Sequence, residues 1–473
     1  MENNITKDII GASDTICAVS TAPGMGGIAV IRISGPQAID IVGRLWHGKK
    51  LDTIATHTAH LGRIDGPDSE ILDQGVATVF RAPNTFTGED TVELSVHGSP
   101  YIQQQLLAAL VNTGCRIAGP GEFTRRAFAN GRLDLTEAEA VADIIAASSR
   151  AAHNLAVSQL RGDLSRSIDA LRDSLVHIAS MLELELDFSE EDVSFADRDL
   201  LTRLATDICD KVDSMASTFA TGDALRRGVP VAIIGRPNVG KSCLLNALLG
   251  TDRAIVSDIP GTTRDTVEDT IDINGITFRF IDTAGLRHTD DPVETIGIQR
   301  AIDKARTARI ILWLVTPDNI GTDDFEENLR EITATISDDT RLIAVLNKID
   351  LDSAPDVTLA HLVSALPQNV TALPVSARLN KGIDTLRVTL SATITAGLDS
   401  GENLIVANVR HYHALRDASV ALRRVLSGLA TAQYTDLIAQ DLREAIHHLS
   451  TITGSITTDN ILDSIFEHFC IGK

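Results

Sequence analysis

Residues 235–242, Gly235-Arg-Pro-Asn-Val-Gly-Lys-Ser242, match the phosphate-binding loop G-x-x-x-x-G-K-[ST]. Backbone N–H groups of such a loop, together with the N-terminus of the next helix, form a positive nest for about two or three phosphates. Lys241 adds a charge near the outer phosphates, and the Ser242 hydroxyl is suited to Mg²⁺. The alternative is an ordinary glycine-rich turn. Apolar runs on both sides, at 231–234 and 243–249, favour the phosphate loop, because it must join a buried strand to a helix.

Two later segments fit the same nucleotide-binding domain. Ser257-Asp-Ile-Pro-Gly-Thr-Thr-Arg-Asp265 predicts a mobile loop in which Thr263 offers a second hydroxyl to Mg²⁺. The strand-like residues 278–281 lead into Asp282-Thr-Ala-Gly285. There, Asp282 would hold the metal through water, and Gly285 would donate its N–H to the terminal phosphate. A D-x-x-G match alone is a weak signal, but its place after a phosphate loop makes it specific.

The choice of base is predicted by Asn347-Lys-Ile-Asp350, which follows the apolar run 342–346. The Asp350 carboxylate can accept hydrogen bonds from N1–H and N2–H of guanine, whereas adenine has no donors in that arrangement. Ser376-Ala-Arg378 would pack against the base from the other side. These elements together predict GTP rather than ATP. The predicted nucleotide contacts are Asn238, Val239, Gly240, Lys241, Ser242, Cys243, Ser257, Asp258, Ile259, Pro260, Gly261, Thr262, Thr263, Asp282, Thr283, Ala284, Gly285, Asn347, Lys348, Asp350, Ser376, Ala377 and Arg378.

Hydrolysis needs a group that orients the attacking water. Small signalling GTPases use a glutamine directly after the D-x-x-G glycine, but this chain has Leu286 there. Because leucine cannot orient water, the catalytic group must lie elsewhere, and Glu294 and Arg264 are the nearest candidates. The alternative for each is an ordinary exposed charged residue.

The N-terminal residues predict a small mixed α/β domain, with strands over 15–20, 28–33, 74–80 and 91–96 and a helix over 102–111. Residues 21–27 look like a second phosphate loop. They lead into a strand, however, so they lack a helix N-terminus to hold an anion. Arg32 and Glu93 fall within the strand patterns, and the sequence alone favours a solvent-facing position for both.

Helices are predicted after residue 130. Thr136 and Glu139 match a capping box, and apolar residues then recur in steps of four and three, as in a helix that packs lengthwise on others. These residues are Leu164, Ile168, Leu171, Leu175, Ile178 and Leu182. Helices are predicted again over 415–429, 439–449 and 460–469. The expected organisation is an N-terminal domain (1–130), a helical domain in two parts (131–227 and 396–473), and a Ras-like P-loop GTPase domain (228–395) inserted between them.

Composition sets limits on location and partners. The chain has a formal net charge of −22, so we expect it by itself to repel RNA. The pairs Arg125-Arg126 and Arg226-Arg227 could contact a phosphate, but such isolated pairs are usually solvated surface. Five scattered cysteines argue against a disulfide framework or a zinc cluster, and most are predicted to be inert core thiols. No apolar run approaches the roughly 20 residues that cross a bilayer, and the polar N-terminus lacks a signal-peptide core, so a cytoplasmic protein is expected.

Stretches spread along the whole chain resemble the MnmE (TrmE) family of tRNA-modification GTPases. They are Thr21-Ala-Pro-Gly24, Arg32-Ile-Ser-Gly35, Phe86-Thr-Gly-Glu-Asp90, Pro120-Gly-Glu-Phe123, Arg132-Leu-Asp-Leu135, Gly235 to Ser242, Gly261 to Asp265, Asp282 to Arg287 and Phe469-Cys-Ile-Gly-Lys473. The resemblance departs from the family pattern at Met25, Arg132, Cys243 and His288. Arg132 in place of lysine keeps the charge but changes the donor geometry. Cys470 in the terminal stretch is either reactive or a packing residue.

The resemblance implies a homodimer that forms a heterotetramer with a flavin-dependent MnmG (GidA) family protein, which carries the FAD. Together they would add a carboxymethylaminomethyl or aminomethyl group to C5 of the wobble uridine of certain tRNAs, held mainly by the partner. A tetrahydrofolate derivative, in the 5,10-methylene or 5-formyl form, would supply the one-carbon unit. The family's folate contacts map onto Arg32, Glu93, Arg132 and Lys473. Its catalytic acid maps onto Glu294, and its K⁺ ligands map onto Asn238, Ser257, Ile259 and Thr262.

Two other classes of function compete with this one. A regulatory GTPase of ribosome assembly shares the nucleotide motifs, but it is expected to carry a basic RNA-binding appendage, which this sequence does not show. A membrane-remodelling or ion-transport GTPase would need a membrane segment. The N-terminal stretches and the terminal Cys-Ile-Gly-Lys favour the tRNA-modification interpretation.

Overall fold

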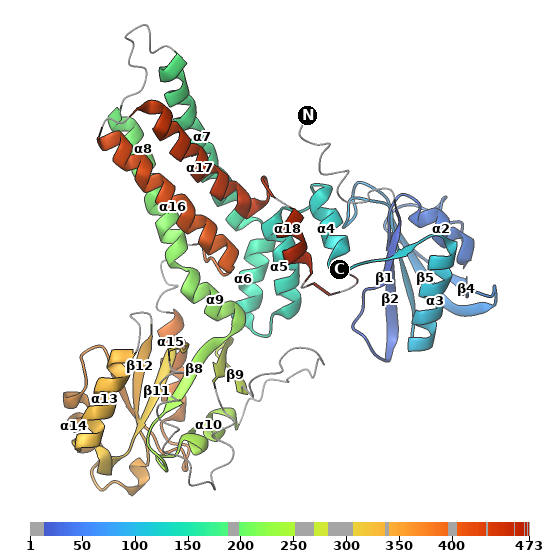
Figure 1. Cartoon of the computed structure of the whole chain (residues 1–473). Coiled ribbons are helices and arrows are strands. Elements are labelled where there is room, and N and C mark those ends of the chain that lie inside the picture. The colour runs from blue at the N-terminus through green and yellow to red at the C-terminus, as the bar shows by residue number, and fades with distance from the viewer. Residues whose placement is uncertain are drawn as a thin grey trace. The chain divides into compact units, whose positions relative to one another are not determined.

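A computed structural model describes residues 14–187, 198–250, 269–281, 306–335, 340–395, 404–431, 434–457, 459–467, 469–470 and 472 (Figure 1). The chain divides into two compact units. The first consists of residues 1–145, 158–188 and 442–473, and the second of residues 146–157 and 189–441. None of the helices in the described ranges is long and apolar enough to span a bilayer.

A seven-stranded sheet organises the N-terminal part of the first unit, in the order β3-β4-β5-β6-β2-β1-β7. β1 runs parallel to β7, and the other neighbouring pairs are antiparallel. Helices α2 (Ala38–Leu45) and α3 (Pro100–Thr113) pack on one face and share its apolar core. The strands are β1 Ile16–Val19, β2 Gly26–Ser34, β3 Trp46–His47, β4 Thr58–Asp65, β5 Ile71–Phe80, β6 Thr91–Gly98 and β7 Arg116–Ile117.

The predicted strands and the helix over 102–111 are confirmed, and residues 21–27 do lead into a strand, β2. The sequence analysis did not predict α2 or β4. In β2 and β6 the buried residues alternate with half-buried ones, which include Arg32 and Glu93. These two side chains therefore leave the sheet on the face opposite to α2 and α3.

Besides α2 and α3, the first unit contains the helices α4 (Glu122–Ala129), α5 (Leu135–Ala146), α7 (Asp163–Asp187) and α18 (Asp459–Phe466). Two more helices, α6 (Arg150–Leu160) and α17 (Thr435–Thr453), cross from one unit into the other. The predicted apolar stripe from Leu164 to Leu182 lies on α7, and all six of its members are buried.

The predicted capping box at Thr136 and Glu139 is wrong by two residues. Asp134 caps α5 instead: its carboxylate accepts from the Glu137 N–H at 2.8 Å, and its own N–H donates to the Glu137 carboxylate at 2.9 Å. Thr136 is buried, and its hydroxyl meets that of Ser165 at 2.6 Å. Asp134 and Glu137 have the same spacing as Thr136 and Glu139, and the chain enters the helix earlier than the sequence pattern indicated.

The second unit contains a six-stranded sheet in the order β13-β12-β11-β8-β10-β9, in which only β9, paired with β10, is antiparallel. Apolar clusters fill both faces of this sheet, one with α10 and α15 and the other with α13 and α14. Because the central strands are buried on both sides, they are continuous apolar runs in the sequence. The strands are β8 Val229–Ile234, β9 Asp269–Ile273, β10 Ile276–Phe280, β11 Ile310–Val315, β12 Arg341–Leu346 and β13 Thr371–Pro374; the helices are α10 Lys241–Leu249, α13 Asp323–Thr335, α14 Pro355–Ala365 and α15 Ile383–Thr395.

Three more helices complete the second unit: α8 (Arg198–Ser217), α9 (Phe219–Arg227) and α16 (Val409–Ala430). The chain enters the sheet from α9, and α16 returns to lie beside α8, as Figure 1 shows. Asp213 of α8 joins the two helices, because its carboxylate accepts from the Ser419 hydroxyl at 2.6 Å and pairs with Arg423 at 2.7 Å. Helical segments from both sides of the nucleotide-binding domain thus meet, as the predicted insertion requires.

Candidate functional site

The phosphate loop joins β8 to α10 at the carboxyl edge of the six-stranded sheet. Gly235 has a φ of +152°, and a Cβ there would lie 2.7 Å from the carbonyl oxygen of Leu314 in β11. Gly240 has a φ of +99°, and a Cβ there would lie 2.5 Å from the side-chain nitrogen of Asn347. Both positions exclude any side chain, so the glycines of the motif are required for the loop to fold against its neighbours.

The polar side chains of this loop are held in place by the backbone. The Lys241 ammonium donates to the carbonyl oxygens of Gly235 at 2.7 Å and Arg236 at 3.0 Å, which keeps its charge inside the curve of the loop. Arg236 is itself tied to Asn319 at 2.7 Å and to Asp324 at 2.8 Å. Ser242 is half-buried in the first turn of α10, and Cys243 beside it is exposed.

Asn347 links three parts of the predicted nucleotide site. Its side-chain amide is buried; the nitrogen donates to the carbonyl oxygen of Val239 at 2.8 Å, and the oxygen accepts from the N–H of Ala377 at 3.1 Å. The segments after β12 and β13 are therefore fastened to the phosphate loop. The sequence motif predicts Asn347 as a nucleotide contact only and does not reveal this bracing role.

Asp350 occupies the position predicted to read guanine. The Ser376 hydroxyl donates to its Oδ1 at 2.6 Å, and this hydrogen bond is the main cause of the lowered pKa of the Asp350 carboxyl. Like an ordinary aspartate, Asp350 is an ionised acceptor at neutral pH, and the lowered pKa favours this form further. A carboxylate on a short turn after β12, with the Ser376–Arg378 segment beside it, can accept both N–H groups of a guanine base.

The described residues support only part of each predicted metal set. Ser242, in the first turn of α10, fits a Mg²⁺ ligand, since a hydroxyl oxygen is what the hard cation prefers. Asn238, in the phosphate loop with a φ of +62°, brings an amide oxygen suitable for K⁺. Other predicted residues lie outside the described part of the chain: Ser257, Asp258, Ile259, Pro260, Gly261, Thr262, Thr263, Asp282, Thr283, Ala284, Gly285, Glu294 and Lys473, with Arg264, Leu286 and His288.

A second candidate site lies in the first unit, where Arg32 of β2 and Glu93 of β6 are directly opposite each other in the sheet. Nε and Nη2 of Arg32 approach Oε1 of Glu93 at 2.9 and 2.8 Å. The two side chains are only 21% and 26% exposed. The predicted face is confirmed, since both lie on the face of the sheet that α2 and α3 leave uncovered, but the sequence did not predict that they form a half-buried ion pair there.

Two aromatic rings accompany this ion pair. The Arg32 guanidinium lies 5.2 Å from the ring centroid of Phe86 and 5.7 Å from that of Phe123. Phe86 is 37% exposed whereas Phe123 is fully buried, so a charged pair beside the accessible Phe86 ring is what a flat heterocycle with N–H donors could contact. Both phenylalanines belong to stretches that carry the family resemblance, but the sequence analysis gave neither of them a role.

In the same domain, Arg126 is buried at 2% exposure among acidic side chains. Its guanidinium contacts Asp14 at 2.6 Å, Glu122 at 3.1 Å and Glu89 at 3.2 Å. Glu89 also accepts from the Ser34 hydroxyl at 2.8 Å, which joins the cluster to β2. The expectation that the pair Arg125-Arg126 is solvated surface is wrong for Arg126, because Asp14 and Glu89, which are distant in sequence, join the nearby Glu122 around it.

Arg132 lies against the loop that carries Phe86. A Cβ on Gly88 would be 3.2 Å from Cγ of Arg132, and the Asn130 side chain donates to the carbonyl oxygen of Thr87 at 2.7 Å. The segment after α4 is thereby fixed to the loop after β5. Arg132 is exposed, and its side chain lies beside Gly88, two residues after Phe86.

The C-terminal tail reaches the same domain. The Ser20 hydroxyl, at the end of β1, donates to the carbonyl oxygen of Gly472 at 3.0 Å across 452 positions of sequence. Gly472 has a φ of +99°, and a Cβ there would clash with the carbonyl oxygen of Val19. Phe469 is buried beside Phe466, whereas Cys470 is exposed, so a packing role for the Cys470 thiol is not supported. Lys473 itself lies outside the described residues.

Comparisons with known proteins cover almost the whole chain. A model described as "GTP-binding protein TrmE N-terminus" matches residues 15–132, and one described as "MnmE helical domain" matches residues 135–470. A "tRNA modification GTPase MnmE" from Parabacteroides distasonis is 49% identical over 467 residues, covering 97% of this chain and 100% of the relative. The protein of that name from Porphyromonas gingivalis is 48% identical over 470 residues, covering 97% and 98%. That from Bacteroides thetaiotaomicron is 46% identical over 469 residues, covering 97% and 99%.

Proposed function

The chain belongs to the MnmE family of tRNA-modification GTPases, and from this premise we propose that its GTP hydrolysis depends on K⁺ and serves modification at C5 of the wobble uridine. The modification is an added carboxymethylaminomethyl or aminomethyl group. The proposed assembly is a cytoplasmic homodimer joined to a flavin-dependent partner that carries FAD and holds most of the tRNA. Relatives of full length that carry the tRNA-modification name favour this function over a ribosome-assembly GTPase.

Each described residue of the nucleotide site has a part in this proposal. The phosphate loop binds the phosphates through its N–H groups, Lys241 balances their charge, and Asp350 selects guanine. Ser242 with Thr263 would hold Mg²⁺, and Asn238 with Ser257, Ile259 and Thr262 would hold K⁺. When bound, these ions supply positive charge against the charge that builds up on the phosphate oxygens. Glu294 would orient the attacking water through a second water, because a carboxylate in contact with the phosphates would be repelled.

The first unit would bind a tetrahydrofolate derivative, which supplies a one-carbon unit when bound. The observation that supports this most directly is the half-buried Arg32–Glu93 pair with Phe86 and Phe123 around it. The Glu93 carboxylate would accept from the N–H groups of the pterin, which would lie against the exposed ring of Phe86. Arg132 and Lys473 would contact the acidic end of the molecule.

Mass spectrometry of wobble uridines tests the proposed function most directly. Transfer RNA from a strain that lacks this gene should lose the C5 aminomethyl-type modification, and the wild-type gene should restore it. A gene with Asp350→Asn should not restore it, whereas one with the remote exposed change Arg330→Ala, on α13, should. The proposal would be contradicted if the fraction of modified wobble uridine were the same in the deleted strain as in the wild type.

A further inference from the structure

Arg236, the second residue of the phosphate loop, is bound to a segment that the nucleotide motifs do not include. Its Nη1 donates to Oδ1 of Asn319 at 2.7 Å, and its Nη2 pairs with Oδ2 of Asp324 at 2.8 Å. Asn319 ends the 3₁₀ turn η3 (Pro317–Asn319) after β11, and Asp324 is the second residue of α13. Because β8 and β11 are parallel neighbours, the Arg236 side chain joins the two segments that follow these strands.

The segment that accepts from Arg236 is held by contacts of its own. Asn319 is 4% exposed, and the Thr322 hydroxyl donates to its carbonyl oxygen at 2.9 Å and to its Oδ1 at 3.2 Å. The Thr322 hydroxyl also accepts from the N–H of Phe325 at 3.3 Å, in the first turn of α13. Phe325 is buried, and its ring stacks on that of Trp313 in β11 with the centroids 5.0 Å apart. The segment is therefore anchored in the core of the domain.

The backbone of Arg236 contacts the residue that acts on the phosphates. Its carbonyl oxygen accepts from the Lys241 ammonium at 3.0 Å, and the carbonyl oxygen of Gly235 accepts from the same ammonium at 2.7 Å. Lys241 is the point charge that a phosphate loop brings to the outer phosphates. A rotation of the Arg236 peptide would displace the ammonium, because a carbonyl that accepts from it would turn away.

The exposure of the partners indicates that this link contributes little to stability. Arg236 and Asp324 are 44% and 58% exposed, so their ion pair stabilises the fold only weakly. Asn319 is buried, but its Oδ1 still accepts from Thr322 when Arg236 is replaced. Loss of the Arg236 side chain should consequently leave the domain folded and allow the start of the phosphate loop to shift.

We propose that Arg236 is a positioning residue for GTP hydrolysis, which holds the peptide that directs Lys241. Through Asn319 and Asp324 it fixes the phosphate loop to the segment between β11 and α13. A displacement of about 1 Å in an active site can lower the rate by up to about a hundredfold, so a smaller shift of the ammonium should cost about tenfold. The inference concerns the GTPase reaction alone, and its failure would leave the wobble-uridine and folate proposals unaffected.

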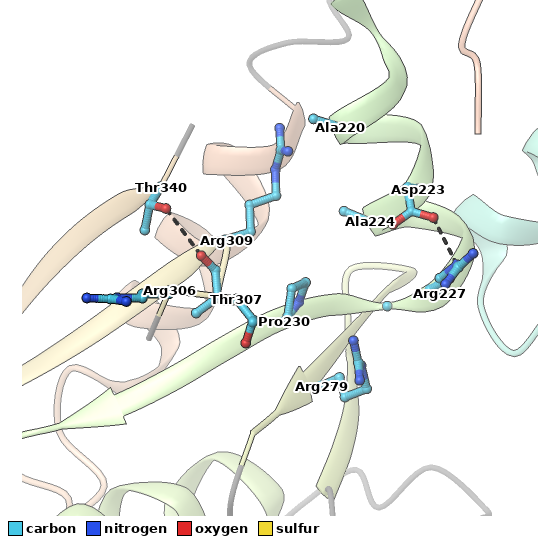
Figure 2. A pocket seen from close by; sticks show the side chains of 12 residues that line it. Ala220, Asp223, Ala224, Arg227, Pro230, Arg279, Arg306, Thr307, Arg309 and Thr340 are labelled. Carbon is cyan, nitrogen blue, oxygen red and sulfur yellow. Dashed lines mark hydrogen bonds and ion pairs between the residues drawn. The ribbon is translucent and has the colours of Figure 1, made fainter. Parts of the chain in front are cut away.

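Arg236→Met is the test variant, because methionine removes the guanidinium donors and keeps an unbranched apolar side chain. The matched control is Arg227→Met on α9. Arg227 is 58% exposed and pairs with Asp223 at 2.9 Å, as Figure 2 shows, so the control loses an ion pair of the same kind. Arg227 lies before the six-residue strand β8 and Arg236 after it, roughly 20 Å apart. The two full-length variants should unfold within about 3 °C of each other.

The kinetic readout is steady-state hydrolysis of GTP in the presence of K⁺ and Mg²⁺. The kcat of Arg236→Met should be about tenfold lower than that of the wild type, and the kcat of Arg227→Met should be unchanged. Arg236→Lys keeps a charged donor for Asn319 and should recover part of the lost rate. Equal kcat values for Arg236→Met and Arg227→Met would overturn the proposal.

Nucleotide affinity separates a displaced ammonium from a loosened domain. In Arg236→Met, affinity for a non-hydrolysable fluorescent GTP analogue should fall about threefold more than affinity for GDP, because GDP lacks the terminal phosphate that Lys241 faces. Equal losses of the two affinities would indicate a general loosening of the nucleotide site and would contradict the positioning role.

A double-mutant cycle with Asn319→Ala tests whether Arg236 acts through this segment. Asn319→Ala should lower kcat by up to the same factor as Arg236→Met, and the double variant should be no slower than Arg236→Met. Factors that multiply in the double variant would show that Arg236 acts independently of Asn319, and the proposal would fail. If the buried change Asn319→Ala prevents folding, the exposed change Asp324→Ala replaces it, with the same expectation for the double variant.

Discussion

The nucleotide site and the Arg32–Glu93 site are assembled in different ways. The nucleotide site uses short segments that each follow a parallel strand, so every segment reaches the same edge of the sheet, where Asn347 fastens them together. The Arg32–Glu93 site combines an antiparallel strand pair with loops, α4 and a chain end that lies 452 positions from its contact. A site whose segments all follow strands at one edge of a sheet can be predicted from local sequence motifs. A site that combines segments distant in sequence can be recognised only in the folded structure. The two sites should therefore respond to different changes.

The largest expected effect concerns the ion at the nucleotide site. We expect hydrolysis of GTP to be faster in KCl than in NaCl by up to about three powers of ten, because a positive charge at the phosphates has an effect of that order. Asn238→Ala should abolish this difference, since the amide oxygen is lost. Steady-state phosphate release in the two salts measures this difference in rate. Folate binding by Asn238→Ala should equal that of the wild type.

Arg264→Ala is the matched variant for this prediction. Loss of activation in Arg264→Ala while Asn238→Ala keeps it would show that an arginine, not K⁺, supplies the charge. Glu294→Ala should lower turnover but leave potassium-dependent association of the nucleotide domains in place, which light scattering in the presence of a transition-state mimic can follow.

The next effect concerns stability of the first unit. Arg126→Met removes a buried charge from among three carboxylates, and breaking such a cluster costs about 3 kcal/mol of the free energy of unfolding. Thermal unfolding should show a lower melting temperature for this unit, and folate affinity should fall with it. The control Arg125→Met, whose side chain pairs with Asp463 at the surface, should have a small effect. Equal melting temperatures for Arg126→Met and the wild type would show that the cluster does not stabilise this unit.

The same cluster predicts a pH dependence. Burial raises the pKa of the Glu122 carboxyl, but hydrogen bonds from Arg116, the Gly119 N–H and Arg126 outweigh it, and the pKa falls below its ordinary 4.5. Glu122 therefore contributes stability that is fully present above the pKa of the unfolded chain and is lost as pH falls through the lower pKa of the folded state. The wild-type unit should lose stability below about pH 4.5, and Glu122→Gln should lose less there.

A smaller effect is expected at Asp350, the residue predicted to bind the guanine base. Asp350→Asn removes the charged acceptor and should weaken GTP binding roughly ten- to hundredfold, while folate binding stays unchanged. The amide of the new residue can donate to the C2 carbonyl of xanthine, so xanthosine triphosphate should bind the variant better than the wild type. Titration with fluorescent nucleotides measures both affinities. Unchanged GTP affinity would remove the assignment of guanine recognition to Asp350.

The smallest effect is expected at the chain end. Deletion of Lys473 should lower affinity for 5-formyltetrahydrofolate about tenfold through loss of one charged contact, and GTP hydrolysis should stay near the wild-type rate. Gly472→Ala should likewise lower folate affinity and leave GTP hydrolysis unchanged, because its side chain would displace the tail from Val19. Calorimetry with the two variants and the wild type decides the matter: equal folate affinities would separate the tail from the Arg32–Glu93 site.

Much of this protein follows from local sequence. The strand–loop–helix unit around residues 235–242, the apolar strands and the stripe on α7 were all predicted, because each depends on residues that are neighbours in sequence or recur with a helix or strand period. The start of α5 was predicted two residues too far along the chain, because Asp134 and Thr136 are both residue types that cap helices.

Other properties were decided by tertiary structure alone. Sequence pattern favoured a solvent face for Arg32 and Glu93 and solvated surface for Arg126; the fold pairs the first two with each other at 21% and 26% exposure and buries Arg126 among carboxylates. A side chain's burial and its charge partners depend on which distant segments reach it. That is set by strand register and by where the chain returns, as Gly472 does at Ser20, and no local pattern of residues carries this information.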